Sequence, residues 1–207
     1  MDGESWWSTC SAYNDAIFPI QVLIMVTGIL VTHLLFAKPS PKTNGLMKAY
    51  LASTFAWSGV VFFLMFGREL PGTFLGAPLF VITSVLFVAD VFIEKTEFKL
   101  PSSRWHRHVT VFLILCAFLY PLFGLPFGHY YPKACVFGVF PCPTTVFALA
   151  LLAAAVPRVD KKVYILLLIW ALPSLGKCFG ALDLYEDCVL FAVGVYGLTM
   201  LIRTWSR

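Results

Sequence analysis

The stretch Gly128-His129-Tyr130-Tyr131-Pro132-Lys133-Ala134-Cys135-Val136-Phe137-Gly138-Val139-Phe140-Pro141-Cys142-Pro143-Thr144-Thr145-Val146-Phe147 is the densest cluster of polar, proline, glycine and thiol groups in the chain. It lies between two apolar runs, at about 108–125 and 143–156. A polar stretch in this position lies at a membrane surface or dips below it, where protein or water must satisfy its backbone. The sequence therefore predicts that residues 128–147 form a functional loop.

The composition indicates a membrane protein. Of the 207 residues, 59% are hydrophobic and 13% are charged, and the mean hydropathy is +0.83. Soluble domains carry about a quarter charged residues, because their surface faces water. Several apolar runs approach the ~20 residues that a helix needs to cross about 30 Å of hydrocarbon. We therefore expect an all-α, polytopic helical bundle that forms a single integral membrane domain over residues 1–207.

Seven apolar segments predict about seven transmembrane helices. Prolines within some of them are tolerated where neighbouring helices satisfy the freed carbonyl groups. Residues 1–16 contain acidic residues but no Lys or Arg, which argues against a secretory signal peptide and predicts a short exposed segment. The predicted helices cover residues 17–37, 46–67, 73–93, 108–125, 143–156, 163–182 and 185–202.

The basic residues predict the orientation of this bundle. The chain has 15 Lys and Arg residues. With loops on alternating sides, three of them fall on one side, namely Arg68, Lys133 and Lys177, and the other 12 fall on the opposite side. Positively charged loops are typically cytoplasmic. We therefore expect a multi-pass protein of the cell membrane, with its amino terminus and residues 128–147 outside and its carboxyl terminus in the cytoplasm. The lipid bilayer is the expected partner, and no basic stripe interleaved with aromatic residues indicates nucleic-acid binding.

The fifth segment is too short to cross a bilayer alone. At about 1.5 Å per residue, residues 143–156 span roughly 21 Å, less than the ~30 Å of hydrocarbon. Either residues 137–142 descend partway as extended chain, or the helix is re-entrant. Irregular backbone at that depth requires surrounding protein or water. The sequence thus predicts a cavity on the outer side, with residues 141–143 near its floor.

A helix that begins at this point can bind a ligand. Pro143 suits the first helical position, with Cys142 as the capping residue and Thr144 and Thr145 in the first turn. The free N–H groups and the helix dipole attract an anion or an electron-rich group, and they favour a reactive thiolate. The alternative is that Pro-Cys-Pro only begins a short helix.

His129 and Tyr131 are expected at the rim of the same cavity, so the predicted ligand-binding residues are His129, Tyr131, Cys142, Thr144 and Thr145. His129 can contact a ligand or carry a proton. The alternative is an interfacial histidine that caps its helix, followed by tyrosines of an aromatic belt. Metal-binding spacings such as Cys-x2-Cys do not occur, so no metal site is predicted; a soft-metal site of Cys142 and His129, for example for copper, stays an alternative.

The pattern G-H-x-Y-P-x4-F-G-x2-P-C-P-T-T-x-F over residues 128–147 resembles the signature of a family of uncharacterised prokaryotic multi-pass membrane proteins, known only as a domain of unknown function. The resemblance extends to residues 13–19 and 169–172. It implies an integral membrane protein of this size and helix number, and it implies no activity. At position 135 the family tends to have proline where this chain has Cys135, which weakens a family-wide thiol pair with Cys142.

Further cysteines and carboxylates lie in the predicted outer loops. Cys178 and Cys188 flank the loop between the last two segments and are candidates for a disulfide, because outward cysteines can pair in an oxidising space. Cys10 with Cys135 is the next candidate pair, although spacing alone does not determine connectivity. The acidic residues of the same outer loop are expected to be solvated: Asp183, Glu186 and Asp187.

Asp90 and His33 form a candidate proton relay near the inner side. Charged groups within membrane helices are costly and often functional, and Asp90 lies about one turn inside the end of the third segment. His33 lies at a similar depth in the first segment and can face Asp90. The alternative is that Asp90 reaches inner-side water or Lys95.

Three functions stay open. The first is binding or passage of a small solute or ion through the outward cavity, which would make the protein a transport protein. The second is a thiol-dependent membrane enzyme or redox partner that uses Cys142. The third is an accessory or scaffold subunit of a membrane complex. The sequence predicts no catalytic residue and no cofactor. A retinal-binding pump is excluded because the last segment lacks a lysine. Membrane hydrolases of the zinc type are excluded because the four histidines are split between the two sides.

Overall fold

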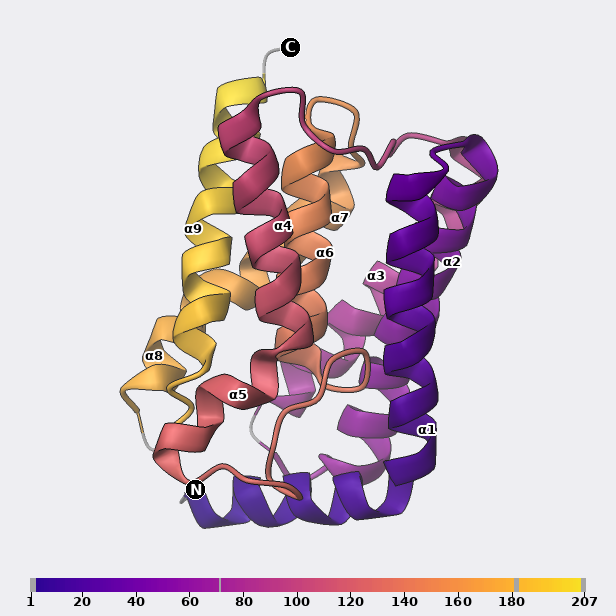
Figure 1. The fold of residues 1–207 in the computed structure, drawn as a ribbon. Helices are drawn as coiled ribbons and strands as arrows, with labels where there is room; N and C mark the ends of the chain where they lie inside the picture. The colour runs from indigo at the N-terminus through magenta and orange to yellow at the C-terminus, as the bar shows by residue number, and fades with distance from the viewer. Residues whose placement is uncertain (1–2, 71, 181–182, 206–207) are drawn as a thin grey trace.

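The computed structural model describes residues 3–70, 72–180 and 183–205, and these residues form a helical bundle without a strand (Figure 1). This confirms the predicted all-α fold. Asp2, within the predicted exposed segment, lies outside the described residues. The elements are α1 (Gly3–Ala37), α2 (Pro41–Trp57), the π-helix η1 (Ser58–Phe66), α3 (Thr73–Ile93), α4 (Arg104–Phe118), α5 (Tyr120–Gly124), the 3-10 helix η2 (Leu125–Phe127), α6 (Pro141–Ala155), α7 (Lys161–Ala171), the 3-10 helix η3 (Leu172–Ser174), α8 (Leu175–Cys178) and α9 (Asp187–Thr204).

The first helix changes direction along its length. In Figure 1 its amino-terminal part lies across one end of the bundle, and the rest of α1 runs along the bundle. Pro19 lies inside α1, where its ring and missing N–H disrupt the turn before it and bend the helix. The transverse part buries Trp6, Cys10 and Tyr13 against the bundle, at the spacing of one helical face. Over the described residues, the predicted exposed segment is thus a helix that buries one face against the bundle and exposes the other.

The short helix α6 lies in the centre of the bundle. It packs against α2, α4, α7 and α9, and all 15 of its residues are buried. At about 1.5 Å per residue it is roughly 22 Å long, so the predicted short fifth segment is present. The helix begins at Pro141 and not at Pro143, because Phe140 is the last extended residue, with φ −96° and ψ 146°. Cys142 is therefore not the cap, and the predicted loop ends at residue 140 and not at 147.

Among the residues that the structure describes, four helices are long and apolar enough to cross a membrane: Glu4–Ala37, Pro41–Phe66, Thr73–Ile93 and Asp187–Thr204. Arg104–Phe118 and Tyr120–Phe127 form a pair bent by 71°, which makes a fifth span if the two are taken together. By length, α6 and α7 fall short of a full crossing. The structure thus shows four to five candidate spans, and seven crossings stay a prediction.

The loops gather at the two ends of the bundle. One end, which we call the N-terminal end, carries the transverse part of α1, residues 128–140 and the start of α9 (Figure 1). The other, which we call the basic end, is where the connections α1–α2, α3–α4 and α6–α7 meet. There the Glu97 N–H donates to the Arg158 carbonyl at 3.0 Å, and Lys95 pairs with Asp160 at 3.2 Å. These contacts bring together the loops that the sequence places on one side.

Candidate functional site: a buried polar cluster at the N-terminal end

A carboxylate lies completely buried where α6 and α9 begin. Asp187, the first residue of α9, has 0% of its surface exposed. Its Oδ1 accepts a hydrogen bond from the Tyr120 hydroxyl at 2.6 Å, and its Oδ2 accepts one from the Cys142 thiol at 3.3 Å. The Lys177 ammonium lies 3.9 Å from Oδ2. A buried carboxylate needs such partners, because its desolvation is otherwise too unfavourable. We call Tyr120, Cys142, Trp170, Lys177 and Asp187 the Asp187 cluster.

Local structure brings these side chains to one point. Asp187 occupies the first turn of α9, where the helix dipole favours a negative charge. Tyr120 begins α5 directly after the non-helical Leu119, at the bend that follows α4. Cys142 lies in the first turn of α6. The chain before α9 is folded back onto α8, since the Leu184 N–H donates to the Lys177 carbonyl at 3.3 Å.

Lys177 connects the Asp187 cluster to the surface. Its side chain is 27% exposed, whereas Asp187 is fully enclosed. The ammonium lies 3.8 Å from the centre of the Trp170 ring, a cation–π contact. The Trp170 ring N–H is buried and has no hydrogen-bond partner within the described part of the chain. The Lys177 ammonium is thus held by the Asp187 carboxylate at a long distance and by the face of the Trp170 ring. The N–H of the same ring can donate a hydrogen bond to a ligand.

A second polar pair lies next to this cluster. His129 Nδ1 lies 3.1 Å from Glu186 Oε2, and its ring lies against Trp7 with the centroids 3.8 Å apart. Both residues are outside the candidate spans. Burial, followed by the charge of Lys133, lowers the pKa of His129, and burial raises the pKa of Glu186 to about 7. Both shifts favour the neutral form of each side chain.

Comparison with known proteins places the chain in a family. One protein family, described as a family of unknown function and designated DUF6064, matches residues 3–206. The chain belongs to the DUF6064 family. This agrees with the resemblance to a domain of unknown function, whereas the signature over residues 128–147 is not tested by the match. No curated protein and no solved structure matches the chain significantly.

In this DUF6064 member, the structure separates the predicted ligand-binding residues. Cys142 joins the Asp187 cluster and His129 the neighbouring pair, but the two threonines have internal partners. Thr144 donates to the Phe140 carbonyl at 2.7 Å and accepts from the Gly138 N–H at 3.2 Å. Thr145 donates to the Pro141 carbonyl at 2.8 Å. These hydroxyl groups stabilise the start of α6.

Tyr131 ties the loop to α1. Its hydroxyl donates to the Asn14 carbonyl at 3.2 Å, and the Asn14 side chain donates to the Ala134 carbonyl at 2.9 Å. The Tyr13 hydroxyl donates to the Val139 carbonyl at 2.9 Å. The irregular backbone of the loop is therefore enclosed by protein, as expected for irregular chain at this depth. The enclosing element is the transverse part of α1 and not the wall of a cavity.

The thiols of the DUF6064 member are free. Cys178 and Cys188, the predicted disulfide candidates, are both free thiols in this structure. They directly follow Lys177 and Asp187, so the thiol pair lies beside the ion pair. Cys10 and Cys135 are buried thiols. Among the described residues, no group of three or more His, Cys, Asp and Glu side chains is arranged to hold a metal ion.

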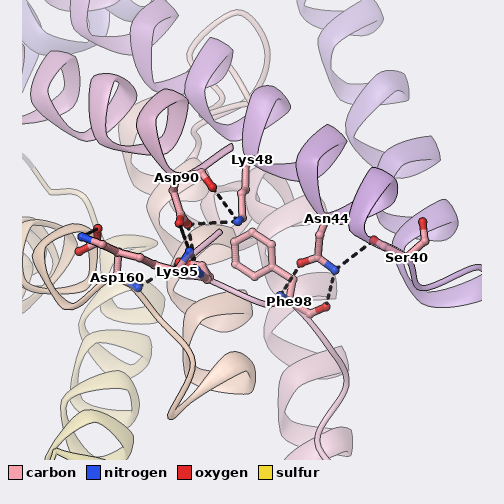
Figure 2. A network of polar contacts seen from close by, with 8 residues as sticks. Ser40, Asn44, Lys48, Asp90, Lys95, Phe98 and Asp160 are labelled. Carbon is pink, nitrogen blue, oxygen red and sulfur yellow. Dashed lines mark hydrogen bonds and ion pairs between the residues drawn. The ribbon is translucent and has the colours of Figure 1, made fainter. Parts of the chain in front are cut away.

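The predicted relay of Asp90 and His33 lacks its central contact. His33 is exposed, whereas Asp90 is buried and forms an ion pair with Lys48 at 3.5 Å (Figure 2). Asp90 Oδ1 also accepts the backbone N–H groups of Lys95 at 2.7 Å and Thr96 at 3.1 Å. The carboxylate therefore holds the chain that leaves α3, and Lys48 neutralises it from α2.

Sequence reasoning missed most of the cluster. Glu186 and Asp187 are buried at 2% and 0% exposure, so the expectation of a solvated acidic loop is wrong for them. Two carboxylates directly before an apolar helical run are a signal for the first turn of a helix. No local sequence pattern indicates that Tyr120 and Lys177 lie beside these carboxylates. The chain folds back between α8 and α9, and this tertiary arrangement brings the residues together.

Proposed function

We propose that this DUF6064 member is an integral membrane protein that binds a small solute or ion at the Asp187 cluster, from the side on which the amino terminus lies. The apolar helices support a membrane location, and the gathering of basic loops at the opposite end supports a cytoplasmic basic end. The observation that carries the binding site is the fully buried Asp187 carboxylate with its thiol, phenol and ammonium partners. Such ionisable groups in membrane bundles typically mark substrate or ion pathways.

The chemistry of the cluster favours a small cation. Lys177 is the member that reaches the surface, and its ammonium has no short hydrogen bond to Asp187. When the Lys177 side chain swings outward, Asp187 loses its positively charged partner and a cation takes the place of the ammonium. Trp170 then donates its N–H to an acceptor on the ligand, such as a water of a hydrated ion or a carbonyl oxygen of a ligand that also carries an ammonium group. Asp183, an exposed carboxylate of the adjacent loop, attracts the same charge.

The start of α6 is less suited to an anion than the sequence predicts. Pro141 and Pro143 supply no N–H group, and the Thr144 N–H points to the Phe140 carbonyl at 3.4 Å. The thiol-enzyme alternative is also less supported, because the hydrogen bond from Cys142 to Asp187 requires a protonated thiol. The scaffold alternative predicts that the enclosed cluster never opens, which separates it from the binding function.

Accessibility of Cys142 tests the proposal. A variant that keeps Cys142 alone among the six cysteines is compared with a control, a variant without native cysteines that carries Ala150→Cys. Ala150 lies in the same helix and is equally enclosed, deeper in the bundle. Right-side-out vesicles are treated with membrane-impermeant methanethiosulfonates that carry either a trimethylammonium or a sulfonate group. Reaction rates are normalised to those of a free thiol in solution.

We expect Cys142 to react at least tenfold faster than the single thiol of the Ala150→Cys control, with the cationic reagent preferred. Millimolar concentrations of a cationic ligand should slow the reaction. Equal inertness of both positions in folded protein would support the scaffold alternative and contradict the binding function. Reaction of Cys142 in inside-out vesicles alone would show that the proposed orientation is reversed.

A further inference from the structure

A cavity of about 440 Å³ lies at the basic end, far from the Asp187 cluster along the bundle. It is bordered by the start of α2, the end of α3, the chain that follows α3 and the connection between α6 and α7. Its polar lining consists chiefly of Asn44, Lys48, Glu94, Glu97, Lys99 and Arg158. Figure 2 shows the network of contacts that holds the wall of this cavity in place.

The buried part of the cavity wall is fixed before any ligand binds. Asn44 contacts both backbone groups of Phe98: its Oδ1 accepts from the N–H at 2.6 Å, and its Nδ2 donates to the carbonyl at 3.2 Å (Figure 2). Lys48 is 2% exposed, and its ammonium donates to the Asp90 carbonyl at 2.9 Å and faces the Asp90 carboxylate at 3.5 Å. An ammonium has three donors, so one N–H of Lys48 is left for a ligand in the cavity.

Charges of both signs surround the mouth of the cavity. Arg158 and Glu97 pair with each other. Lys99 and Glu94 are exposed, and neither forms an ion pair within residues 3–70, 72–180 and 183–205. The cavity therefore offers a buried ammonium donor, an unpaired lysine and an unpaired carboxylate. This set complements a ligand with one phosphate and one ammonium group, because each ligand charge then meets its opposite.

An apolar groove continues from the cavity along the outside of the bundle. The groove has a volume of about 400 Å³ and lies between α2 and α3. Small side chains on α2, including Ala52 and Ala56, leave room for the groove, while Val88 and Phe92 border it on α3. Val91 lines both the cavity and the groove, so the polar and the apolar parts are contiguous. A ligand that fills both parts has a polar head and an apolar chain.

We propose that this combined site binds a phospholipid with a zwitterionic headgroup that carries a primary ammonium, as in phosphatidylethanolamine. The phosphate is held by Lys48 and Lys99, the ammonium is held by Glu94, and an acyl chain lies in the groove beside Ala56 and Val91. The site depends on the membrane location but not on the Asp187 cluster. Its failure and the failure of solute binding are therefore separate results.

Lipid retention by the purified full-length protein tests this site. Delipidated protein in detergent is titrated with phosphatidylethanolamine, phosphatidylcholine, phosphatidylglycerol or glycerophosphoethanolamine, which is the headgroup without chains. Native mass spectrometry measures the bound fraction. We expect phosphatidylethanolamine to be retained at least fivefold more than either other lipid, because choline has no N–H to donate to Glu94 and glycerol has no positive charge. The chain-free headgroup should bind weakly, because it leaves the groove empty.

Surface variants identify the position of the bound lipid. Lys99→Gln and Glu94→Gln should each reduce the preference for phosphatidylethanolamine severalfold, and Ala56→Leu should reduce retention of all three lipids by filling the groove. Lys42→Gln is the matched control, because Lys42 is exposed at the same end but does not line the cavity. Equal retention of the three lipids, a preference for phosphatidylglycerol, or undiminished retention in both Lys99→Gln and Ala56→Leu would overturn the proposal. Binding of the free headgroup as tightly as the lipid would overturn the role of the groove.

Discussion

The thiol of Cys142 lies 3.3 Å from a carboxylate oxygen of Asp187, a residue 45 positions further along the chain. This hydrogen bond joins the first turns of α6 and α9 inside the bundle. The Tyr120 hydroxyl reaches the other oxygen of the same carboxylate at 2.6 Å. The stability of the N-terminal end of the bundle therefore depends on one negative charge that is enclosed by donors.

Removal of that charge should destabilise the protein. In Asp187→Asn the side-chain shape is kept, but Lys177 loses its counter-ion and an amide N–H is turned toward a donor. The Tyr120 hydroxyl or the Cys142 thiol is then left buried without its acceptor, which typically costs about 1–3 kcal/mol. Thermal unfolding in detergent should show a clearly lower midpoint. Asp183→Asn is the control, because Asp183 is an exposed carboxylate of the same loop and should change the midpoint little. Equal effects of the two substitutions would contradict a special role for Asp187.

The Lys48–Asp90 pair should behave differently from an exposed ion pair. Its side chains are 2% and 1% exposed, whereas those of Arg158 and Glu97 are 69% and 43% exposed. Lys48→Met should lower the free energy of unfolding by about 3–5 kcal/mol, because the Asp90 carboxylate is then left buried without its cation. Arg158→Ala should lower it by at most about 1 kcal/mol. Denaturant titration in detergent micelles provides both values, and similar losses would show that burial does not decide the contribution.

Two adjacent threonines allow a test of the start of α6. Thr144→Val removes the acceptor of the Gly138 N–H, which is left buried without a partner, at a cost of about 1–3 kcal/mol. Thr145→Val removes only a hydroxyl that donates to its own helix, so its effect should be smaller. Both side chains are fully buried and the substitution is the same, which makes Thr145→Val a matched control. The unfolding midpoints of the two variants are measured side by side. A decrease of the midpoint in Thr145→Val as large as that in Thr144→Val would contradict the proposed role of the Gly138 N–H.

The His129–Glu186 pair should give the protein a measurable pH dependence. Burial raises the pKa of Glu186 from its ordinary value of 4.5 to about 7, so the folded state binds a proton that the unfolded state releases between these values. Stability from this group is therefore full below about pH 4.5 and falls until about pH 7. The lowered pKa of His129 acts in the opposite direction, since the unfolded state then binds the extra proton below pH 6.5.

Glu186→Gln should separate these contributions. The midpoint of the variant relative to the parent protein should rise between pH 5 and pH 8 by several degrees, because the glutamine carries no charge to desolvate. In His129→Gln, the unfolding midpoint should instead fall more steeply with rising pH than it does in the parent protein, because the opposing contribution of His129 is removed. Midpoints measured in parallel at pH 5, 6, 7 and 8 provide the comparison. A pH-independent difference between Glu186→Gln and the parent protein would show that Glu186 does not titrate in this window.

Hydropathy along the chain was sufficient for much of the architecture. The apolar segments around residues 73–93 and 185–202 correspond closely to α3 and α9, and the short fifth segment corresponds to α6. These are local properties, since a run of apolar side chains leaves water whatever it packs against. The grouping of the basic loops also followed from the order of segments. The buried face of residues 3–16 had a local signal in Trp6, Cys10 and Tyr13, but their acidic neighbours concealed it.

The partners of the polar groups were decided by tertiary structure alone. Lys48 lies 42 positions from Asp90, and no local pattern pairs them. Asp187 was expected in water because its loop is acidic, yet the fold of the chain between α8 and α9 places it beside Cys142 and Tyr120. Sequence shows which groups must find a partner when they leave water. Which partner they meet depends on how separate helices pack, because a hydrogen bond or ion pair forms only at contact distance.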